Sequence, residues 1–235
     1  MPSGYGNEEL MARGFWGPRQ ESAEPLADRL VGFLWGLDGA IGETLRWSSS
    51  RPPGKPIAEP VHALQMLADA FDGNTDAPHL GVTQSYQGRG EKTGDASITM
   101  SVGGFSDSPN VRNSVVLKWR DGVDVAGVIL RQLVSAWDPD WAAVAPRSFQ
   151  RAMTEVQPVG SPGPKLGCLT YLSEGRAQAL PGGMDKYVEK LDNGGVVIGS
   201  GEGDGFLSLD KATELVEMLG SGTALSPVPT DRSKY

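Results

Sequence analysis

The spacing of apolar residues changes along this chain, and the change limits the folds that it can adopt. Near the N-terminus, apolar side chains recur every three or four residues, which is the period of an amphipathic helix. They are Leu26, Leu30, Phe33, Leu34 and Leu37. Between residues 80 and 119, apolar and polar side chains alternate instead, as in half-buried strands. Helical spacing returns after Asp124.

These periods predict the order of the main elements. Helices are expected at 22–39, 59–72, 124–138, 148–154 and 209–219. Strands are expected around 14–17 and at 44–47, 80–86, 96–102, 114–119, 166–172, 187–191 and 196–198. The three strands between 80 and 119 are expected to form an antiparallel meander. Because helices and strands do not alternate regularly, we predict an α+β fold with a mixed, mainly antiparallel sheet and about four to five helices.

The segment 158–164 is the best candidate for a linker, because it consists largely of proline and glycine. The roughly 60 residues that follow it would make only a marginal core by themselves. We therefore expect a single domain, 12–221, with sub-lobes at about 12–157 and 165–221. The polar ends of the chain, 1–11 and 222–235, are expected to be disordered.

The chain is acidic, with 21 Lys and Arg residues against 29 Asp and Glu residues and a formal net charge of −8. Nucleic-acid binders need a basic footprint, so direct binding to nucleic acid is not expected. An acidic surface favours basic protein partners through electrostatic steering. Solubility alone also explains a charge of this size.

Three features predict a cytoplasmic protein that does not cross a membrane. Cys168 is the single cysteine, so no intrachain disulfide can form. No apolar stretch approaches the roughly 18 residues that a membrane-spanning helix needs. The first residues lack the basic and apolar regions of a secretory signal.

Residues suited to catalysis are few and poorly placed. His62 and His79 are the two histidines, and they are expected on a helix surface and in a loop. The Gly-x-Ser-x-Gly elbow of serine hydrolases is absent, since Gly104-Phe105-Ser106-Asp107-Ser108 ends in serine. Cys168 lies among leucines, which is typical of a buried, inert thiol. We therefore predict no enzymatic activity.

The glycine-rich segment 199–205 follows a predicted strand but fits no cofactor or metal motif. Its spacing fails both the dinucleotide fingerprint and the EF-hand, so no cofactor is expected. Its carboxylates, Glu202 and Asp204, have two possible interpretations. They belong either to a flexible acidic loop or to a surface that contacts a basic partner.

The tryptophans are expected mainly in the core, including Trp35, Trp119 and Trp137. The segment Trp137-Asp138-Pro139-Asp140-Trp141 is different, because Pro139 must end the preceding helix. We expect an exposed tip there, with the carboxylates of Asp138 and Asp140 flanked by aromatic rings. Such a tip suits either a structural corner or an interface hot spot.

Several of these segments together resemble the immunity protein 52 family of bacterial polymorphic toxin systems. They are Phe15-Trp16-Gly17-Pro18-Arg19 leading into a helix, Arg46-Trp47, Trp137-Asp138-Pro139-Asp140-Trp141, Gly167-Cys168-Leu169-Thr170-Tyr171-Leu172, Leu180-Pro181 and Gly194-Gly195. The resemblance covers about residues 12–220. Cys168 departs from it, since the family has an aromatic residue there. The loop around Glu202 has no counterpart in it.

The resemblance implies an antitoxin that binds and neutralises a cognate secreted toxin, here a restriction-endonuclease-like nuclease. Such a nuclease has a basic cleft, and we expect an acidic protein without catalytic residues to occlude its active site. The acidic residues singled out above, Asp138, Asp140, Glu202 and Asp204, are our candidates for contacting the toxin and mimicking phosphate. Structural roles would fall to the remaining motif residues, which are Trp16, Gly17, Pro18, Arg19, Trp47, Trp137, Trp141 and Tyr171.

Two other functions stay open at the level of sequence. One is a hydrolase with a carboxylate site, which requires converging Asp or Glu side chains with raised pKa values in a pocket. The other is a scaffold that binds a protein other than a toxin.

Overall fold

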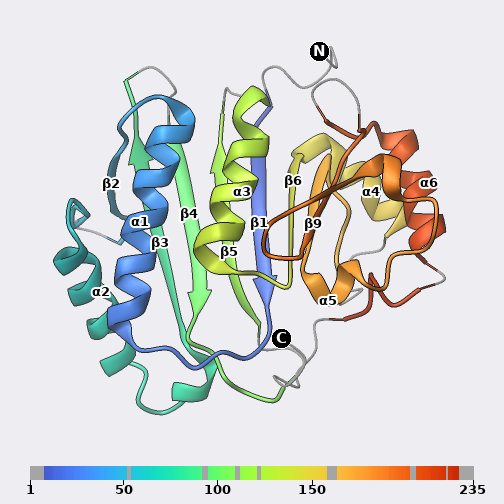
Figure 1. Cartoon of the computed structure of the whole chain (residues 1–235). Coiled ribbons are helices and arrows are strands. Elements are labelled where there is room, and N and C mark those ends of the chain that lie inside the picture. The colour runs from blue at the N-terminus through green and yellow to red at the C-terminus, as the bar shows by residue number, and fades with distance from the viewer. Residues whose placement is uncertain are drawn as a thin grey trace.

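The computed structural model describes residues 8–51, 54–91, 95–108, 112–120, 123–157, 163–201, 205–220 and 222–227. Within these ranges, nine strands form one sheet in the order β2-β3-β4-β5-β1-β6-β7-β9-β8, and every pair of neighbours is antiparallel (Figure 1). The strands are β1 (Leu10–Trp16), β2 (Arg46–Ser49), β3 (Val82–Arg89), β4 (Asp95–Val102), β5 (Asn113–Trp119), β6 (Trp141–Pro146), β7 (Leu169–Leu172), β8 (Val188–Lys190) and β9 (Val196–Ile198).

The described residues also form six α-helices. They are α1 (Ala23–Ile41), α2 (Pro60–Asp72), α3 (Ala126–Trp137), α4 (Arg147–Val156), α5 (Glu174–Ala177) and α6 (Leu209–Leu219). Short 3₁₀ turns lie at Pro78–Leu80, Val123–Val125 and Asp185–Tyr187. The predicted α+β class and the antiparallel meander β3-β4-β5 are confirmed. The helix count is slightly above the four to five expected, because α5 is a single turn and too short to show a period.

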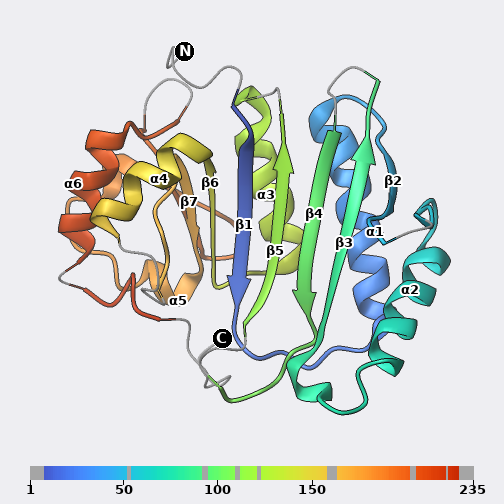
Figure 2. The ribbon, with the colours of Figure 1, turned by 180° about the vertical axis from the view of Figure 1, so that it is seen from behind.

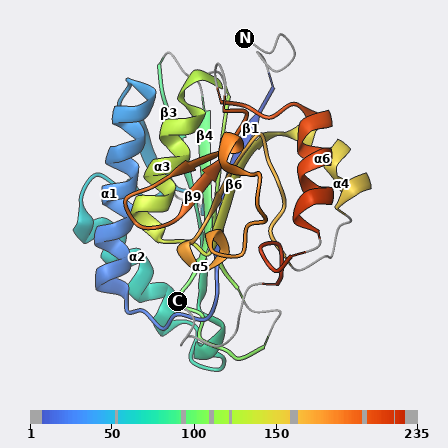
Figure 3. The same ribbon diagram turned by 45° about the vertical axis from the view of Figure 1, so that its right-hand side comes forward.

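The helices cover the two faces of the sheet unequally. Helices α1, α2 and α3 lie on one face, whereas α4 and α6 lie on the other (Figure 3). On that second face, β3, β4, β5 and β1 carry no helix (Figure 2). Their burial alternates residue by residue, as expected for strands that are packed on one side only.

Two apolar clusters divide according to the face of the sheet. The larger cluster lies under α1, α2 and α3, and it includes Leu169 and Tyr171 from the C-terminal part of the chain. The smaller cluster lies under α4 and α6, and it includes Phe149 and Met153 from the N-terminal part. The division between the cores therefore does not follow the predicted sub-lobe boundary at 158–164. Residues 158–162 lie outside the described ranges.

Strand β6 was not expected from the sequence. All six of its residues are buried, because α3 packs on one of its faces and α4 on the other. A strand that is covered on both sides loses the alternation of apolar and polar residues, so Trp141–Pro146 carries no period of two.

Both ends of the predicted domain extend further than expected. Strand β1 begins at Leu10, inside the segment 1–11 that was expected to be disordered. At the other end, Ala224 is fully buried in the smaller cluster. The Arg176 guanidinium donates to the carbonyl oxygens of Ala224 and Ser226, at 2.7 and 2.8 Å. Residues 224–226 are thus packed against the fold, and the rest of the predicted tail, 228–235, lies outside the described ranges.

Candidate functional site

The opening motif of the chain builds a buried aromatic cluster beneath α1 and α3. Trp16, at the end of β1, stacks on Trp137, with 5.9 Å between the ring centroids. Phe33 of α1 meets Trp137 edge to face at 6.0 Å. All three rings are almost fully buried. We call this group, with Arg19, Glu21 and Arg29, the Trp16–Trp137 cluster.

Charged side chains close the cluster at its edge. The Arg19 guanidinium lies over Trp16 at 5.0 Å, and that of Arg29 lies over Trp137 at 5.6 Å. Glu21 joins them, since its carboxylate is 2.6 Å from Arg29 NH1 and 3.7 Å from Arg19 Nε. Arg19 also donates to the Trp137 carbonyl at 2.8 Å. The two arginines thus surround Glu21 and cover the tryptophan rings, and the motif holds the start of α1 against the end of α3.

The Gly17-Pro18 segment is fixed by a residue that the sequence did not single out. Asn113 is buried, and its Nδ2 donates to the carbonyl oxygens of Gly17 and Gly104 at 2.7 and 3.0 Å. Its Oδ1 accepts from the Gly104 N–H at 2.9 Å. The signal for Asn113 is weak, because a polar residue at the start of a predicted strand is common.

Asp138 and Asp140 do not form the expected shared tip. Asp138 is exposed, and it ends α3 in a left-handed conformation with a φ of 43°. Asp140 is only 5% exposed. Its Oδ2 accepts from Arg176 Nε and NH2 at 2.8 and 2.6 Å, and its Oδ1 accepts from Ser173 Oγ at 3.2 Å. The expectation for Asp140 is corrected: the chain turns inward after Pro139, and this carboxylate holds a buried arginine.

The other aromatic residues of the motif lie in the core as well. Trp47 packs against Gly88, which lies opposite it on β3. Trp141 stacks on Phe15, with 4.7 Å between the centroids. Tyr171 accepts a hydrogen bond from Asn193 Nδ2 at 3.0 Å, and burial raises the pKa of its phenol to about 12.

Trp35 contradicts the prediction that it anchors the core, because its side chain is 60% exposed. It lies on the side of α1 that faces away from the sheet, together with Glu24, Asp28, Gly32 and Gly39, all of which are exposed. We call these five residues the α1 outer face. A Cβ atom added to Gly32 or Gly39 would meet no atom within 4 Å, so the backbone on either side of the indole is open to a partner.

The α1 outer face belongs to an acidic layer. Helices α1 and α2 together contain five acidic residues and one basic residue, Arg29, which is occupied in the Trp16–Trp137 cluster. Hydrogen bonds from its own backbone N–H and from the Ser22 side chain lower the pKa of Glu24 below its usual value. Glu24 is therefore ionised at neutral pH.

The uncovered face of the sheet has a different chemistry. Its outward side chains on β3 and β4 are mostly hydroxyls, and they bond to each other across the strands: Thr83 with Ser101 at 2.9 Å, and Ser85 with Thr99 at 3.1 Å. On β1, Arg13 lies over the Trp141 ring at 5.7 Å. Burial lowers the pKa of Arg13 to about 10, so it keeps its charge at neutral pH. This face combines paired hydroxyls with positive charge.

The two remaining predicted carboxylates, Glu202 and Asp204, lie outside the described residues. The glycines on either side, Gly201 and Gly205, line a hollow of about 490 Å³, together with Tyr187 and Glu189.

No catalytic or metal-binding arrangement is found in the described parts of the chain. His62 and His79 are exposed, and Cys168 is buried. Within the described ranges, no group of three or more His, Cys, Asp or Glu side chains is placed to hold a metal ion. Nor does any helix there have the length and apolar character needed to cross a bilayer.

The sequence matches the immunity protein 52 family over residues 8–203, which includes every buried aromatic residue of the motif described above. The chain belongs to the immunity protein 52 family. Membership implies an immunity function and a cognate toxin as partner. A comparison with curated proteins finds no match. A solved structure with a similar fold is the Pseudomonas aeruginosa T6SS protein PA0821, at 11% identity and a TM-score of 0.47, covering 93% of this chain and 74% of that chain.

Proposed function

We propose that this member of the immunity protein 52 family binds its cognate toxin through the α1 outer face and occludes the toxin's active site. The toxin would be a nuclease of the restriction-endonuclease-like class with a basic cleft, and the immunity protein would itself perform no catalysis. The observation that carries the proposal is Trp35, a large aromatic side chain that is 60% exposed on the same face of α1 as the exposed carboxylates of Glu24 and Asp28.

Tryptophan is enriched among the residues that dominate binding energy at protein interfaces, where its ring fills a pocket on the partner. An exposed indole on a helix surface contributes little to folding, so it needs another explanation than the core. The neighbouring Gly32 and Gly39 leave room for the partner to reach the base of the ring. This combination suits an anchor for a partner protein.

The charges around Trp35 favour a basic partner. Glu24 and Asp28 are exposed and form none of the ion pairs found among the described residues. Asp138 is also exposed, and it follows Trp137, whose carbonyl oxygen is bonded to Arg19 near the start of α1. A nuclease must present positive charge to phosphates, and carboxylates on an inhibitor can occupy the same positions. Glu202 and Asp204 stay in the proposal as further contacts, whereas Asp140 is withdrawn because it is buried.

The hydrolase alternative is not favoured by the carboxyl groups of the described residues. Asp38 has a pKa raised above its usual value, chiefly by burial. Asp38 Oδ1 accepts from the Leu45 N–H at 3.1 Å, where it fixes the turn after α1. It is one carboxyl group with a structural contact, whereas a hydrolytic site needs converging groups.

The test uses the toxin encoded beside this gene, made inactive by substitution in its own catalytic site. Trp35→Ala should weaken 1:1 binding by about 30-fold, equivalent to about 2 kcal/mol, and should reduce protection in a growth assay against active toxin. Leu80→Ala is the matched control, because Leu80 is also an exposed apolar side chain but lies outside α1. Binding by Trp35→Ala that equals that of the control would overturn the proposed site. Failure of the wild type to bind or protect would overturn the toxin partnership.

A further inference from the structure

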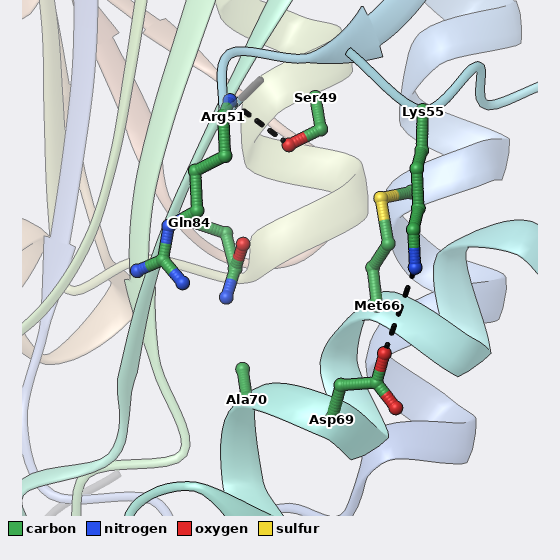
Figure 4. Close-up of a pocket in the computed structure, with 7 residues that line it drawn as sticks. All are labelled: Ser49, Arg51, Lys55, Met66, Asp69, Ala70 and Gln84. Atoms are coloured by element: carbon green, nitrogen blue, oxygen red, sulfur yellow. Dashed lines mark hydrogen bonds and ion pairs between the residues drawn. The ribbon is translucent and has the colours of Figure 1, made fainter. Parts of the chain in front are cut away.

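A second hollow, of about 190 Å³, lies between α2 and the edge of the sheet formed by β2 and β3 (Figure 4). It is lined by Ser49, Arg51, Lys55, Met66, Asp69, Ala70 and Gln84. None of these residues belongs to the α1 outer face or to the Trp16–Trp137 cluster. The pocket therefore requires its own explanation.

Gln84 is the strongest indication of a ligand. It occupies a helix-facing position on β3, between Val82 and Tyr86, and is only 5% exposed. Within the described residues its carboxamide has no hydrogen-bond partner, and in Figure 4 it extends into the space between Arg51 and Ala70. The amide atoms are not among the fully enclosed polar atoms that lack a partner, so in the ligand-free protein they reach the water in the hollow. A bound polar group would take the place of that water and accept a hydrogen bond from the amide.

The charged side chains that line the pocket indicate that the ligand is negatively charged. Lys55 Nζ lies 3.9 Å from Asp69 Oδ2, and Asp69 Oδ1 also accepts from Gln65 at 2.7 Å. These two opposite charges offset each other. The Arg51 guanidinium forms no ion pair with any described residue, and Arg51 lines the same hollow as Gln84 (Figure 4). The described lining thus carries one unbalanced positive charge.

We propose that this pocket binds the carboxylate of a small monoanionic group. The planar fork of Arg51 matches the two oxygens of a carboxylate, which it can bind in a bidentate manner. The Gln84 amide would donate a further hydrogen bond from the buried side. Ser49 Oγ accepts from the Arg51 N–H at 3.2 Å, which leaves its hydroxyl hydrogen to donate. Met66 and Ala70 form an apolar wall for a short aliphatic chain.

Such a carboxylate has two possible sources, a free metabolite and an Asp or Glu side chain of the toxin. The pocket and its chemistry are independent of the proposed function, and only the second source rests on it. Competition separates the two. If the toxin supplies the carboxylate, saturating propionate will weaken toxin binding, and Arg51→Gln will do the same. If the ligand is a free metabolite, neither change will affect the toxin.

The experiment titrates the full chain with propionate, using two-dimensional NMR to follow the side-chain amide of Gln84, assigned by its loss in Gln84→Leu. We expect saturable shifts at this amide with propionate, and none with propionamide, which has the same shape without the charge. Arg51→Gln should weaken the affinity at least tenfold. Arg89→Gln removes the same charge from the face of β3 opposite Gln84, so it should leave the propionate affinity within twofold.

Gln84→Leu should also abolish binding while the protein stays folded, with Gln87→Leu as its matched control on the exposed side of the same strand. The proposal would be overturned by the absence of a saturable shift up to about 100 mM propionate. It would equally be overturned by an affinity that Arg51→Gln and Arg89→Gln reduce alike, or by propionamide binding as well as propionate.

Discussion

The Trp16–Trp137 cluster and the α1 outer face lie on opposite sides of the same helix, and both contain tryptophan and carboxylate side chains. In the cluster, the rings are buried and Glu21 is shared by two arginines. On the outer face, Trp35 is exposed, and Glu24 and Asp28 take part in none of the ion pairs found among the described residues. The same residue types therefore stabilise the fold on one side and stay available to a partner on the other.

This comparison shows that residue type alone does not distinguish structure from binding. What matters is whether each side chain is buried against the rest of the chain or exposed to solvent. The aspartates on either side of Pro139 show the same difference. Asp140 is buried and accepts two hydrogen bonds from Arg176, whereas Asp138 is exposed. The following predictions test this division, from the largest expected effect to the smallest.

Truncating one tryptophan on each side of the helix should lower the stability of the protein by very different amounts. Trp137→Ala should lower the free energy of unfolding by about 3–5 kcal/mol, because it leaves a cavity under α1 and α3. Trp35→Ala should change it by about 0.5 kcal/mol or less, since the ring is mostly in water. Chemical denaturation measures both. A similar loss in the two variants would mean that Trp35 has a structural role and would remove the contrast.

The buried ion pair provides a second large effect. Arg176→Met leaves the Asp140 carboxylate buried without its partner, and should cost about 3–5 kcal/mol of stability. Arg131→Met is the control, because Arg131 pairs with Glu189 at the surface, where such pairs contribute about 1 kcal/mol or less. Thermal and denaturant unfolding should separate the two variants clearly. Equal losses would show that burial does not decide the strength of these pairs.

The carboxylates of the α1 outer face should act mainly on the rate of toxin association. The double change Glu24→Gln and Asp28→Asn should slow association at low salt by about tenfold, and should flatten its dependence on ionic strength. Glu155→Gln with Glu217→Gln removes the same charge from α4 and α6, on the other face of the sheet, and should have little effect. Stopped-flow or surface-based kinetics measure these rates. If both double variants slow association equally, net charge rather than this face directs the encounter.

Gln84 should give the smallest change, and in the stabilising direction. Gln84→Leu places an apolar side chain at a position that is only 5% exposed, so the free energy of unfolding of the ligand-free protein should rise by about 1 kcal/mol. Gln87→Leu, on the exposed side of β3, should leave it within about 0.5 kcal/mol. A clear loss of stability in Gln84→Leu would show that the amide is needed for folding rather than reserved for a ligand.

Local patterns in the sequence predicted the helices and the meander well. The stripe from Leu26 to Leu37 matches the buried face of α1, and the alternation in 96–102 matches the packing of β4 on one side. Strand β6 was missed because it is covered on both faces. Trp35 was misplaced, although it follows the inward Leu34 by one residue, about 100° around the helix, which is the signal that should have turned it outward.

The parts of the site that depend on contacts distant in sequence could not be predicted. Asp140 and Arg176 are 36 residues apart, and no motif joins them. The alternation of β3 puts Gln84 on the inward face with Val82 and Tyr86, but only the position of α2 shows that a hollow lies beside it. The family resemblance identified the right segments, and the structure shows that most of their residues serve the core.

One guanidinium also fixes where the chain can be shortened. Arg176 holds Asp140 with one edge and the carbonyl oxygens of Ala224 and Ser226 with the other. The last described turn is therefore fastened to the beginning of β6, far from it in sequence. Trimming the protein back to residue 221 would remove the two carbonyl oxygens that Arg176 binds and would uncover the smaller core.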